Sequence, residues 1–165
     1  MCSIIAYASC KDNDVSSVLL DALSLMEYRG YDSVGIAVLN GSSINVRKGI
    51  GNVREVSNKH RFDELVGRVG IGHTRWAAYG HVSNNNAHPH TSCNGKIAIV
   101  HNGIIDNYME LREMLKSHKF KSDTDSEVIA HLLEHLISKG YNLKDAMVNT
   151  LKLLNGSYAF VALLD

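Results

Sequence analysis

Residues 33–48, which read SVGIAVLNGSSINVRK, decide the fold class. Two runs suited to β-strands, 33–39 and 43–48, flank Asn40-Gly41, a dipeptide typical of tight hairpin turns. We therefore expect an antiparallel pair of strands here. Around this hairpin, strand-like and helix-like segments interleave without strict alternation, which favours layers of sheet and helix over a doubly wound parallel sheet. The sequence predicts an α+β fold.

The remaining elements follow from the spacing of apolar residues. Further strands are predicted at residues 3–8, 69–74, 96–101 and 158–164. Helices are predicted at residues 15–27, 108–118, 125–139 and 143–154, and over part of 53–66. Asn13 or Asp14 suits the cap of the first helix, and Asn155-Gly156 suits the end of the last. Residues 75–94 form a long polar segment, and loops of this length are often functional.

Composition limits the class of protein. The 165 residues suit one domain, and 45% hydrophobic content is enough for a packed core. Seventeen basic residues match seventeen acidic ones, so no excess positive charge favours nucleic acid or an anionic membrane. Three cysteines at irregular spacing are no disulfide framework and predict a reducing, cytoplasmic setting. No apolar run reaches the length of a membrane span, and we expect no export signal.

Cys2 is the sharpest chemical feature. Methionine is usually removed when a small residue follows it, and this would leave Cys2 with both a thiol and a free α-amine. An α-amine has an ordinary pKa near 8, so it can accept the thiol proton at neutral pH. That pairing is the logic of an N-terminal nucleophile. A lone cysteine at the start of a strand is, however, more often inert.

Three other segments carry groups that could bind a substrate. Asn102-Gly103 follows an apolar strand and could offer a side-chain amide and a backbone N–H to one oxyanion, although Asn-Gly is also an ordinary turn. Arg75 could grip a carboxylate or form a surface ion pair, and Trp76 beside it could belong to the core. Asp125 could hold an ammonium group, or Thr124 or Asp125 could simply cap the helix that follows.

Nine histidines raise metal binding as a rival interpretation. The candidates are His88 and His90, a His-x-His pair, together with His73, His81 and His101. Their spacing matches no named zinc motif, and few acidic residues lie near the pair. We therefore expect neither a metal site nor a cofactor.

Six motifs, in order along the chain, resemble the class II glutamine amidotransferases. They are Cys2-Ser3-Ile4-Ile5, residues 27–33 (EYRGYDS), His73-Thr74-Arg75-Trp76-Ala77, residues 86–90 (NAHPH), residues 100–105 (VHNGII) and residues 124–131 (TDSEVIAH). The second and third motifs resemble, within that class, the aminotransferases that make glucosamine 6-phosphate from fructose 6-phosphate. The similarity covers essentially the whole chain.

The resemblance implies a four-layer α/β/β/α sandwich of the N-terminal nucleophile hydrolase type. It implies that Cys2 attacks the side-chain amide of glutamine, forms a glutamyl thioester and releases ammonia. Asn102 and the Gly103 N–H would form the oxyanion hole. Arg75 would bind the substrate α-carboxylate, and Asp125 with the Gly103 carbonyl would bind its α-ammonium group.

Other positions show what the resemblance leaves open. Trp76 resembles a residue that gates ammonia passage, and Arg29 matches a wall of the site. The family usually has glycine where Ser3 stands, and Thr-His where Ala78 and Tyr79 stand. Loss of the threonine hydroxyl would remove one contact to the glutamine carboxylate, worth on the order of 1 kcal/mol. This predicts weaker glutamine binding with the chemistry intact.

Length is the largest departure from the family. Residues 1–165 would form the amidotransferase domain, incomplete at its C-terminal end, without the sugar-isomerase domains that would bind fructose 6-phosphate. The chain alone should then release ammonia from glutamine without making an amino sugar. We also expect association with itself or with a partner. The alternative is a non-catalytic, partner-binding remnant of the domain.

Overall fold

Two antiparallel sheets form the centre of the protein in the computed structural model, which describes residues 2–10, 15–77 and 80–165. The first sheet has the order β1-β4-β2-β3, and the second has the order β5-β6-β7. The strands of the first are β1 (Ser3–Ala8), β2 (Ser33–Asn40), β3 (Ser43–Ile50) and β4 (Val69–Arg75). Those of the second are β5 (His90–Thr91), β6 (Ile97–Ile105) and β7 (Gly156–Leu164).

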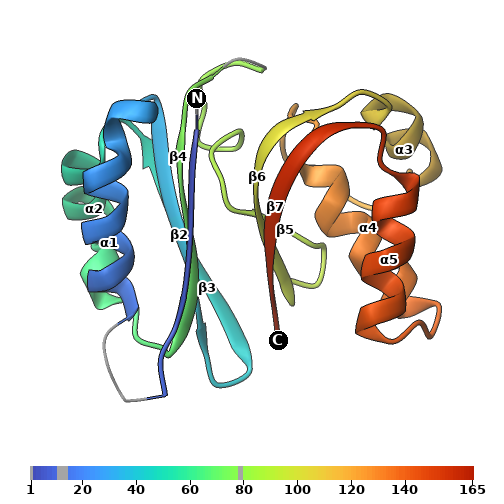
Figure 1. Ribbon diagram of the computed structural model, residues 1–165, viewed down its shortest axis with the longest axis horizontal. Coiled ribbons are helices and arrows are strands. Elements are labelled where there is room, and N and C mark those ends of the chain that lie inside the picture. Colours follow the sequence, from blue (N-terminus) through green and yellow to red (C-terminus); the bar gives the residue numbers. More distant parts are fainter. Residues whose placement is uncertain (1, 11–14, 78–79) are drawn as a thin grey trace.

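Helices cover the outer face of each sheet (Figure 1). The first sheet is covered by α1 (Val15–Met26) and α2 (Val53–His60), with short 3-10 turns at η1 (Glu27–Arg29) and η2 (Phe62–Glu64). The second sheet is covered by α3 (Tyr108–Met114), α4 (Glu127–Ser138) and α5 (Leu143–Leu153). Among the described residues, no helix is both long and apolar enough to cross a membrane.

Three apolar clusters hold the four layers together. Leu19, Leu23 and Ile36 belong to the cluster between the first sheet and its helices. Ile99 and Leu132 belong to the matching cluster between the second sheet and its helices. A third, smaller cluster fills the space between the two sheets and contains Ala37, Ile71, Ala98, Val100 and Leu163. The predicted α/β/β/α sandwich is confirmed.

The hairpin that decided the fold class is present. β2 pairs with β3 from Ser33↔Ile50 to Asn40↔Ser43. Gly41 follows directly with a φ of 59°, a backbone conformation that glycine adopts without strain. Ile36 packs toward the helices and Ala37 toward the other sheet, as the alternation of side chains along a strand requires.

The structure corrects several predicted boundaries. β6 does not end at His101 but continues to Ile105, because β7 pairs with it as far as Ile105↔Gly156. The long polar segment contains a short strand, β5, which pairs with β6. α3 ends at Met114, four residues before the predicted end at 118. The predicted cap of α1 at Asn13 or Asp14 lies outside the described residues.

Candidate active site

A cavity of ≈ 410 Å³ lies where the two sheets bring their polar residues together. Its lining includes seven residues singled out from the sequence: Cys2, Arg29, Arg75, Trp76, Asn102, Gly103 and Asp125. They come from β4, β6, η1, the segments next to β1 and β4, and the segment before α4, so only the tertiary fold brings them together. Two further predicted residues, Ala78 and Tyr79, lie outside the part of the chain that the structure describes.

Cys2 is held at the mouth of this cavity by strand pairing. Ser3 pairs with Thr74, so Cys2 comes next to the residues that follow β4. The Cys2 Sγ accepts a hydrogen bond from the Trp76 N–H at 3.2 Å and lies 3.5 Å from the Trp76 carbonyl. The buried Ser3 hydroxyl donates to the Met26 carbonyl at 3.3 Å, which explains how serine is accommodated at this position.

Asn102 presents its amide nitrogen toward Cys2. Its Nδ2 donates to the Cys2 carbonyl at 3.2 Å, and its Oδ1 lies 2.9 Å from His73 Nε2. Burial lowers the pKa of His73 to about 4, so the ring is neutral at pH 7. The His101 carbonyl also lies 3.1 Å from His73 Nε2, and two acceptors at one nitrogen place the ring proton there. His73 thereby fixes the Asn102 amide with its nitrogen facing the cavity.

Gly103 lies inside β6, where a larger residue does not fit. Its φ is 129°, outside the range that other residues adopt readily. A Cβ added to Gly103 would lie 2.0 Å from the Ser157 carbonyl oxygen on β7. Glycine is therefore required at position 103 by the close approach of β7 and by the backbone conformation. Asn102-Gly103 is part of a strand and not a turn.

Arg75 ends β4 as a buried cation that lines the cavity. Its Nη1 donates to the His81 carbonyl at 3.3 Å, and its Nη2 donates to the Gly80 carbonyl at 3.4 Å. Burial lowers the pKa of Arg75 from its ordinary value, while nearby negative groups including Asp125 raise it. Arg75 is therefore not the surface ion pair that its sequence context also allowed.

Asp125 is positioned by β6 rather than by a helix. Its Oδ2 accepts from the Ile105 N–H at 2.7 Å, and its Oδ1 accepts from the Ser126 hydroxyl at 3.4 Å. The Ser126 Oγ in turn lies 2.7 Å from His101 Nδ1. α4 begins at Glu127 with Ser126 before it and has no side-chain cap there, so the alternative of Asp125 as a helix cap is wrong.

Trp76 and Arg29 complete the rim. Trp76 is 47% exposed, which excludes the core position that its sequence context also allowed. It packs edge-on against Tyr31, with ring centroids 5.8 Å apart. The Arg29 Nε donates at 3.4 Å to the same Cys2 carbonyl that accepts from Asn102, so Arg29 also helps to hold the backbone of Cys2.

Residues 73–165, more than half of the chain, match the family described as the glutamine amidotransferase domain. The chain belongs to this family. The matched segment contains Arg75, Asn102, Gly103 and Asp125 of the cavity lining.

Relatives of this glutamine amidotransferase domain are much longer than the chain. A protein of Pyrococcus horikoshii is 51% identical over 99% of this chain, which covers 27% of that protein. One of Sulfolobus acidocaldarius is 48% identical over 99% of this chain, which covers 28% of that protein. Both are named glutamine–fructose-6-phosphate aminotransferase (isomerizing). The chain thus spans just over a quarter of the curated relatives it matches.

A solved structure supports the same fold for the amidotransferase domain. The glutamine phosphoribosylpyrophosphate amidotransferase of B. subtilis superposes with a TM-score of 0.82 and 27% identity. The match covers 99% of this chain and 35% of that one. Because almost every element of this chain is included, the two sheets and their helices form the shared unit.

Three of the histidines considered as metal ligands in the sequence, His73, His88 and His90, lie side by side in the structure. The buried His73 and His88 rings are tilted with centroids 4.2 Å apart, and His88 meets His90 edge-on with centroids 4.5 Å apart. Burial lowers the pKa of His88 and His90 well below the ordinary value of 6.5. Within the described residues, these rings are not among the side chains whose ligand atoms converge as a metal site requires.

The sequence did not identify the residues that hold the cavity-lining side chains in place through hydrogen bonds. His73 orients Asn102, and Ser126 links Asp125 to His101. A signal existed for His73, because it lies two positions before Arg75 on β4 and such residues share one face of a strand. No comparable signal existed for Ser126, whose contacts depend on how α4 packs against β6.

Proposed function

We propose that this domain hydrolyses the side-chain amide of glutamine and that Cys2 is the nucleophile. The observation that carries the proposal is the convergence of a thiol, an amide donor, a buried cation and a carboxylate on one cavity. These groups belong to Cys2, Asn102, Arg75 and Asp125. Free glutamine has an amide at one end and a carboxylate and an ammonium group at the other, so each group has a partner.

The reaction divides into two steps. After removal of Met1, the α-amine of Cys2 takes the thiol proton, and the thiolate attacks the amide carbon of glutamine. The C–N bond then breaks, the nitrogen leaves as ammonia with that proton, and a glutamyl thioester forms. Water attacks the thioester, which releases glutamate and regenerates the thiol. No redox partner or cofactor is needed.

The oxyanion is assigned to Asn102 and Gly103. Negative charge develops on the amide oxygen in both steps, and preorganised N–H donors stabilise it. Asn102 Nδ2 already faces Cys2 and is held by a neutral histidine, so little reorganisation is required. The Gly103 N–H would be the second donor. Its carbonyl would contribute to ammonium binding with Asp125.

Arg75 and Asp125 would bind the amino-acid end of glutamine. Arg75 offers a planar, bidentate fork to the α-carboxylate. One carboxylate oxygen of Asp125 accepts a hydrogen bond from the Ile105 N–H, and this bond holds the side chain in place beside the cavity. Residues 78–79, between the anchored Ala77 and Gly80, are assigned a supporting role in carboxylate binding. Arg29 is a positioning residue for Cys2.

The ammonia would serve glucosamine 6-phosphate synthesis from fructose 6-phosphate. The support is the printed name shared by relatives at about half identity, of which this chain covers only the amidotransferase part. We assign residues 1–165 to the glutaminase domain and the sugar chemistry to a separate sugar-isomerase domain. Trp76, which is exposed, would influence where ammonia leaves. A cytoplasmic location stays a prediction.

One sample tests the proposal directly. Intact mass establishes whether Met1 has been removed, and ammonia and glutamate release from glutamine is then measured on the same preparation. We expect equal amounts of both products and no amino sugar when fructose 6-phosphate is added. Processed protein that releases no ammonia would support the non-catalytic alternative. A retained N-terminal tag should suppress turnover, because an acylated amine is not a base.

Association is the remaining part of the proposal. β7 lies at one edge of its sheet and β1 at one edge of the other. Strand edges present unpaired backbone groups that can recruit another chain. We therefore expect self-association or a bound partner, measurable by light scattering across a dilution series. A single monomeric mass at every concentration would contradict self-association.

A further inference from the structure

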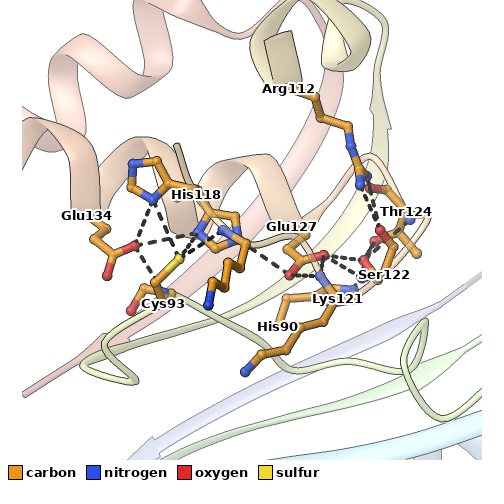
Figure 2. A network of polar contacts seen from close by, with 12 residues as sticks. His90, Cys93, Arg112, His118, Lys121, Ser122, Thr124, Glu127 and Glu134 are labelled. Atoms are coloured by element: carbon orange, nitrogen blue, oxygen red, sulfur yellow. Dashed lines mark hydrogen bonds and ion pairs between the residues drawn. The ribbon is translucent and has the colours of Figure 1, made fainter. Parts of the chain in front are cut away.

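A second cluster of reactive side chains lies away from the glutamine cavity. Cys93, His118, His131 and Glu134 each place one potential ligand atom within 4.8 Å of those of the others. Cys93 lies in the turn between β5 and β6, and His118 follows α3. His131 and Glu134 lie one turn apart on α4. Figure 2 shows Cys93, His118 and Glu134 pointing toward one another from these separate segments.

The distances within this cluster fit the edges of one coordination tetrahedron. Cys93 Sγ lies 3.8 Å from His118 Nδ1 and 3.7 Å from His131 Nδ1. Glu134 Oε2 lies 3.0 Å from His118 Nδ1 and 3.5 Å from His131 Nδ1. Zinc bonded to sulfur at about 2.3 Å and to nitrogen or oxygen at about 2.0–2.1 Å gives edges of roughly 3.5 and 3.3 Å. The two sulfur–nitrogen distances exceed the ideal edge by 0.2–0.3 Å, and the two nitrogen–oxygen distances lie on either side of theirs, so only small movements would complete the site.

Outer contacts orient His131 for coordination. Its Nε2 lies 3.4 Å from Glu127 Oε1, while its Nδ1 faces Cys93 and Glu134. A ring N–H donated to a carboxylate leaves the other nitrogen with its lone pair directed at the cluster. Metal-binding histidines commonly have such a carboxylate behind them. Glu127 is itself held by the N–H and hydroxyl groups of Ser122.

The sulfur and the carboxylate are also fixed from outside. The Lys119 N–H donates to Cys93 Sγ at 3.2 Å, a contact that stabilises a thiolate. Glu134 Oε2 accepts from the Cys93 N–H at 3.0 Å, and Oε1 accepts from the Asn94 N–H at 2.8 Å. These bonds hold the turn against α4. They also leave lone pairs on Glu134, because each carboxylate oxygen can accept more than one bond.

Charge favours an added cation here. A thiolate and a carboxylate with two neutral imidazoles carry two negative charges, which one divalent ion balances. The ligand set of one sulfur, two nitrogens and one oxygen suits a metal of intermediate softness such as Zn²⁺, and does not suit Mg²⁺ or Ca²⁺. Cys93 is exposed, so an ion can reach the site from solvent.

We propose that Cys93, His118, His131 and Glu134 form a structural Zn²⁺ site that joins the β5–β6 turn, the segment after α3 and helix α4. Four protein ligands leave no open position, which is typical of structural zinc. The ion would bind α4 through His131 and Glu134, in the middle of the helix. This proposal does not depend on glutamine hydrolysis, and it departs from our expectation that the sequence holds no metal site.

The test is metal binding by the untagged full chain in chelator-free buffer with a non-thiol reductant. We expect one Zn²⁺ per chain after dialysis and a zinc-dependent rise in the melting temperature, because a ligand that binds only the folded state stabilises it. Co²⁺ in place of zinc should give the intense bands of tetrahedral coordination and a sulfur-to-metal charge-transfer band. Folded wild-type protein that retains no zinc and shows no such band would overturn the proposal.

Matched variants locate the site. Cys93→Ser and His118→Ala should remove the charge-transfer band or weaken zinc binding by more than roughly 100-fold, beyond the roughly 10–100-fold expected for the outer-shell change Glu127→Gln. Cys10→Ser, at another exposed cysteine, should keep wild-type affinity. Cys2→Ser should keep it too. If the band survives in Cys93→Ser and disappears in Cys2→Ser, the metal binds in the glutamine cavity and the proposal is wrong.

Discussion

Cys2 and Cys93 are thiols on the same small domain, and their sulfur atoms meet different neighbours. The Cys2 sulfur contacts only backbone groups of Trp76 among the described hydrogen-bond partners. The Cys93 sulfur lies beside the ring nitrogens of His118 and His131. The comparison teaches that the groups around a cysteine, and not its exposure or its place at a strand end, decide which chemistry it supports.

The charged groups around the two sulfur atoms also differ. The cavity at Cys2 holds a buried cation, Arg75, and amide N–H donors, which stabilise negative charge that forms during a reaction. The cluster at Cys93 supplies lone pairs and the carboxylate of Glu134 without a buried cation among its four members. The first arrangement suits a nucleophile that gains and loses charge, and the second suits a resident ion.

The largest expected effect separates the two thiols by activity. Cys2→Ala should lower glutamine hydrolysis by roughly four orders of magnitude or more, because loss of a covalent nucleophile leaves only binding and oxyanion stabilisation. Initial rates of ammonia release measure this. Cys10→Ser is the matched control and should keep the wild-type rate. Normal turnover in folded Cys2→Ala protein would falsify the assignment of the nucleophile.

The next effect tests what makes the Cys2 cavity suited to negative charge. Asn102→Ala removes one oxyanion donor and should lower kcat by about 100- to 1,000-fold, with a much smaller change in KM. Steady-state kinetics with glutamine give both constants. A rise in KM with kcat unchanged would show that Asn102 binds the ground state and has no special role in the transition state.

Much of the fold could be predicted because its signals are local. The hairpin of β2 and β3, and the helices α1, α4 and α5, follow from turn residues and apolar spacing. The end of β6 could not be predicted, since Asn102-Gly103 has the local features of a turn and only pairing with β7 extends the strand. β5 was missed because a two-residue strand carries no periodicity of its own.

The two sites differ in how far the sequence reveals them. Cys2 and Asn102 were singled out through motifs and chemistry, and both line the cavity. The Cys93 cluster was not predicted as a metal site, because its members lie far apart in the chain and match no metal-binding spacing. Only His131 and Glu134, three positions apart on one helix, gave a local signal. Tertiary packing alone adds the other two ligands.

The buried histidines make the folding stability of the protein depend on pH. His73 has its pKa lowered to about 4 by burial, and His88 has its pKa lowered well below 6.5 by burial and neighbouring positive groups. Below pH 6.5 the unfolded chain therefore binds protons that the folded chain does not. Stability is fully present above that pH and is lost on acidification. We expect urea midpoints to fall between pH 7 and pH 5, measured with a chelator present.

One variant tests how much a single histidine contributes to the change of unfolding free energy with pH. Among the residues that the structure describes, neither ring nitrogen of buried His88 has a hydrogen-bond partner, so His88→Leu removes an ionisable group without breaking a described side-chain hydrogen bond. It should reduce the slope of unfolding free energy against pH by up to about 1.4 kcal/mol per pH unit. Exposed His81→Gln is the control and should leave the slope unchanged. Equal slopes in wild type and His88→Leu would contradict this account of the buried histidines.

The smallest expected effect concerns position 78, which the family resemblance links to glutamine binding. The residues on both sides are anchored there: the Ala77 N–H donates to Asp32 Oδ2 at 2.7 Å, and the Gly80 carbonyl accepts from Arg75 at 3.4 Å. The family resemblance implies that a threonine hydroxyl at position 78 contacts the glutamine carboxylate. One added hydrogen bond is worth about 1 kcal/mol, so Ala78→Thr should lower KM about fivefold and leave kcat nearly unchanged. Ala78→Val, which has a similar shape without the hydroxyl, is the matched control and should give no such gain. If threonine and valine change KM equally, shape rather than hydrogen bonding acts at this position, and the segment binds glutamine in another way.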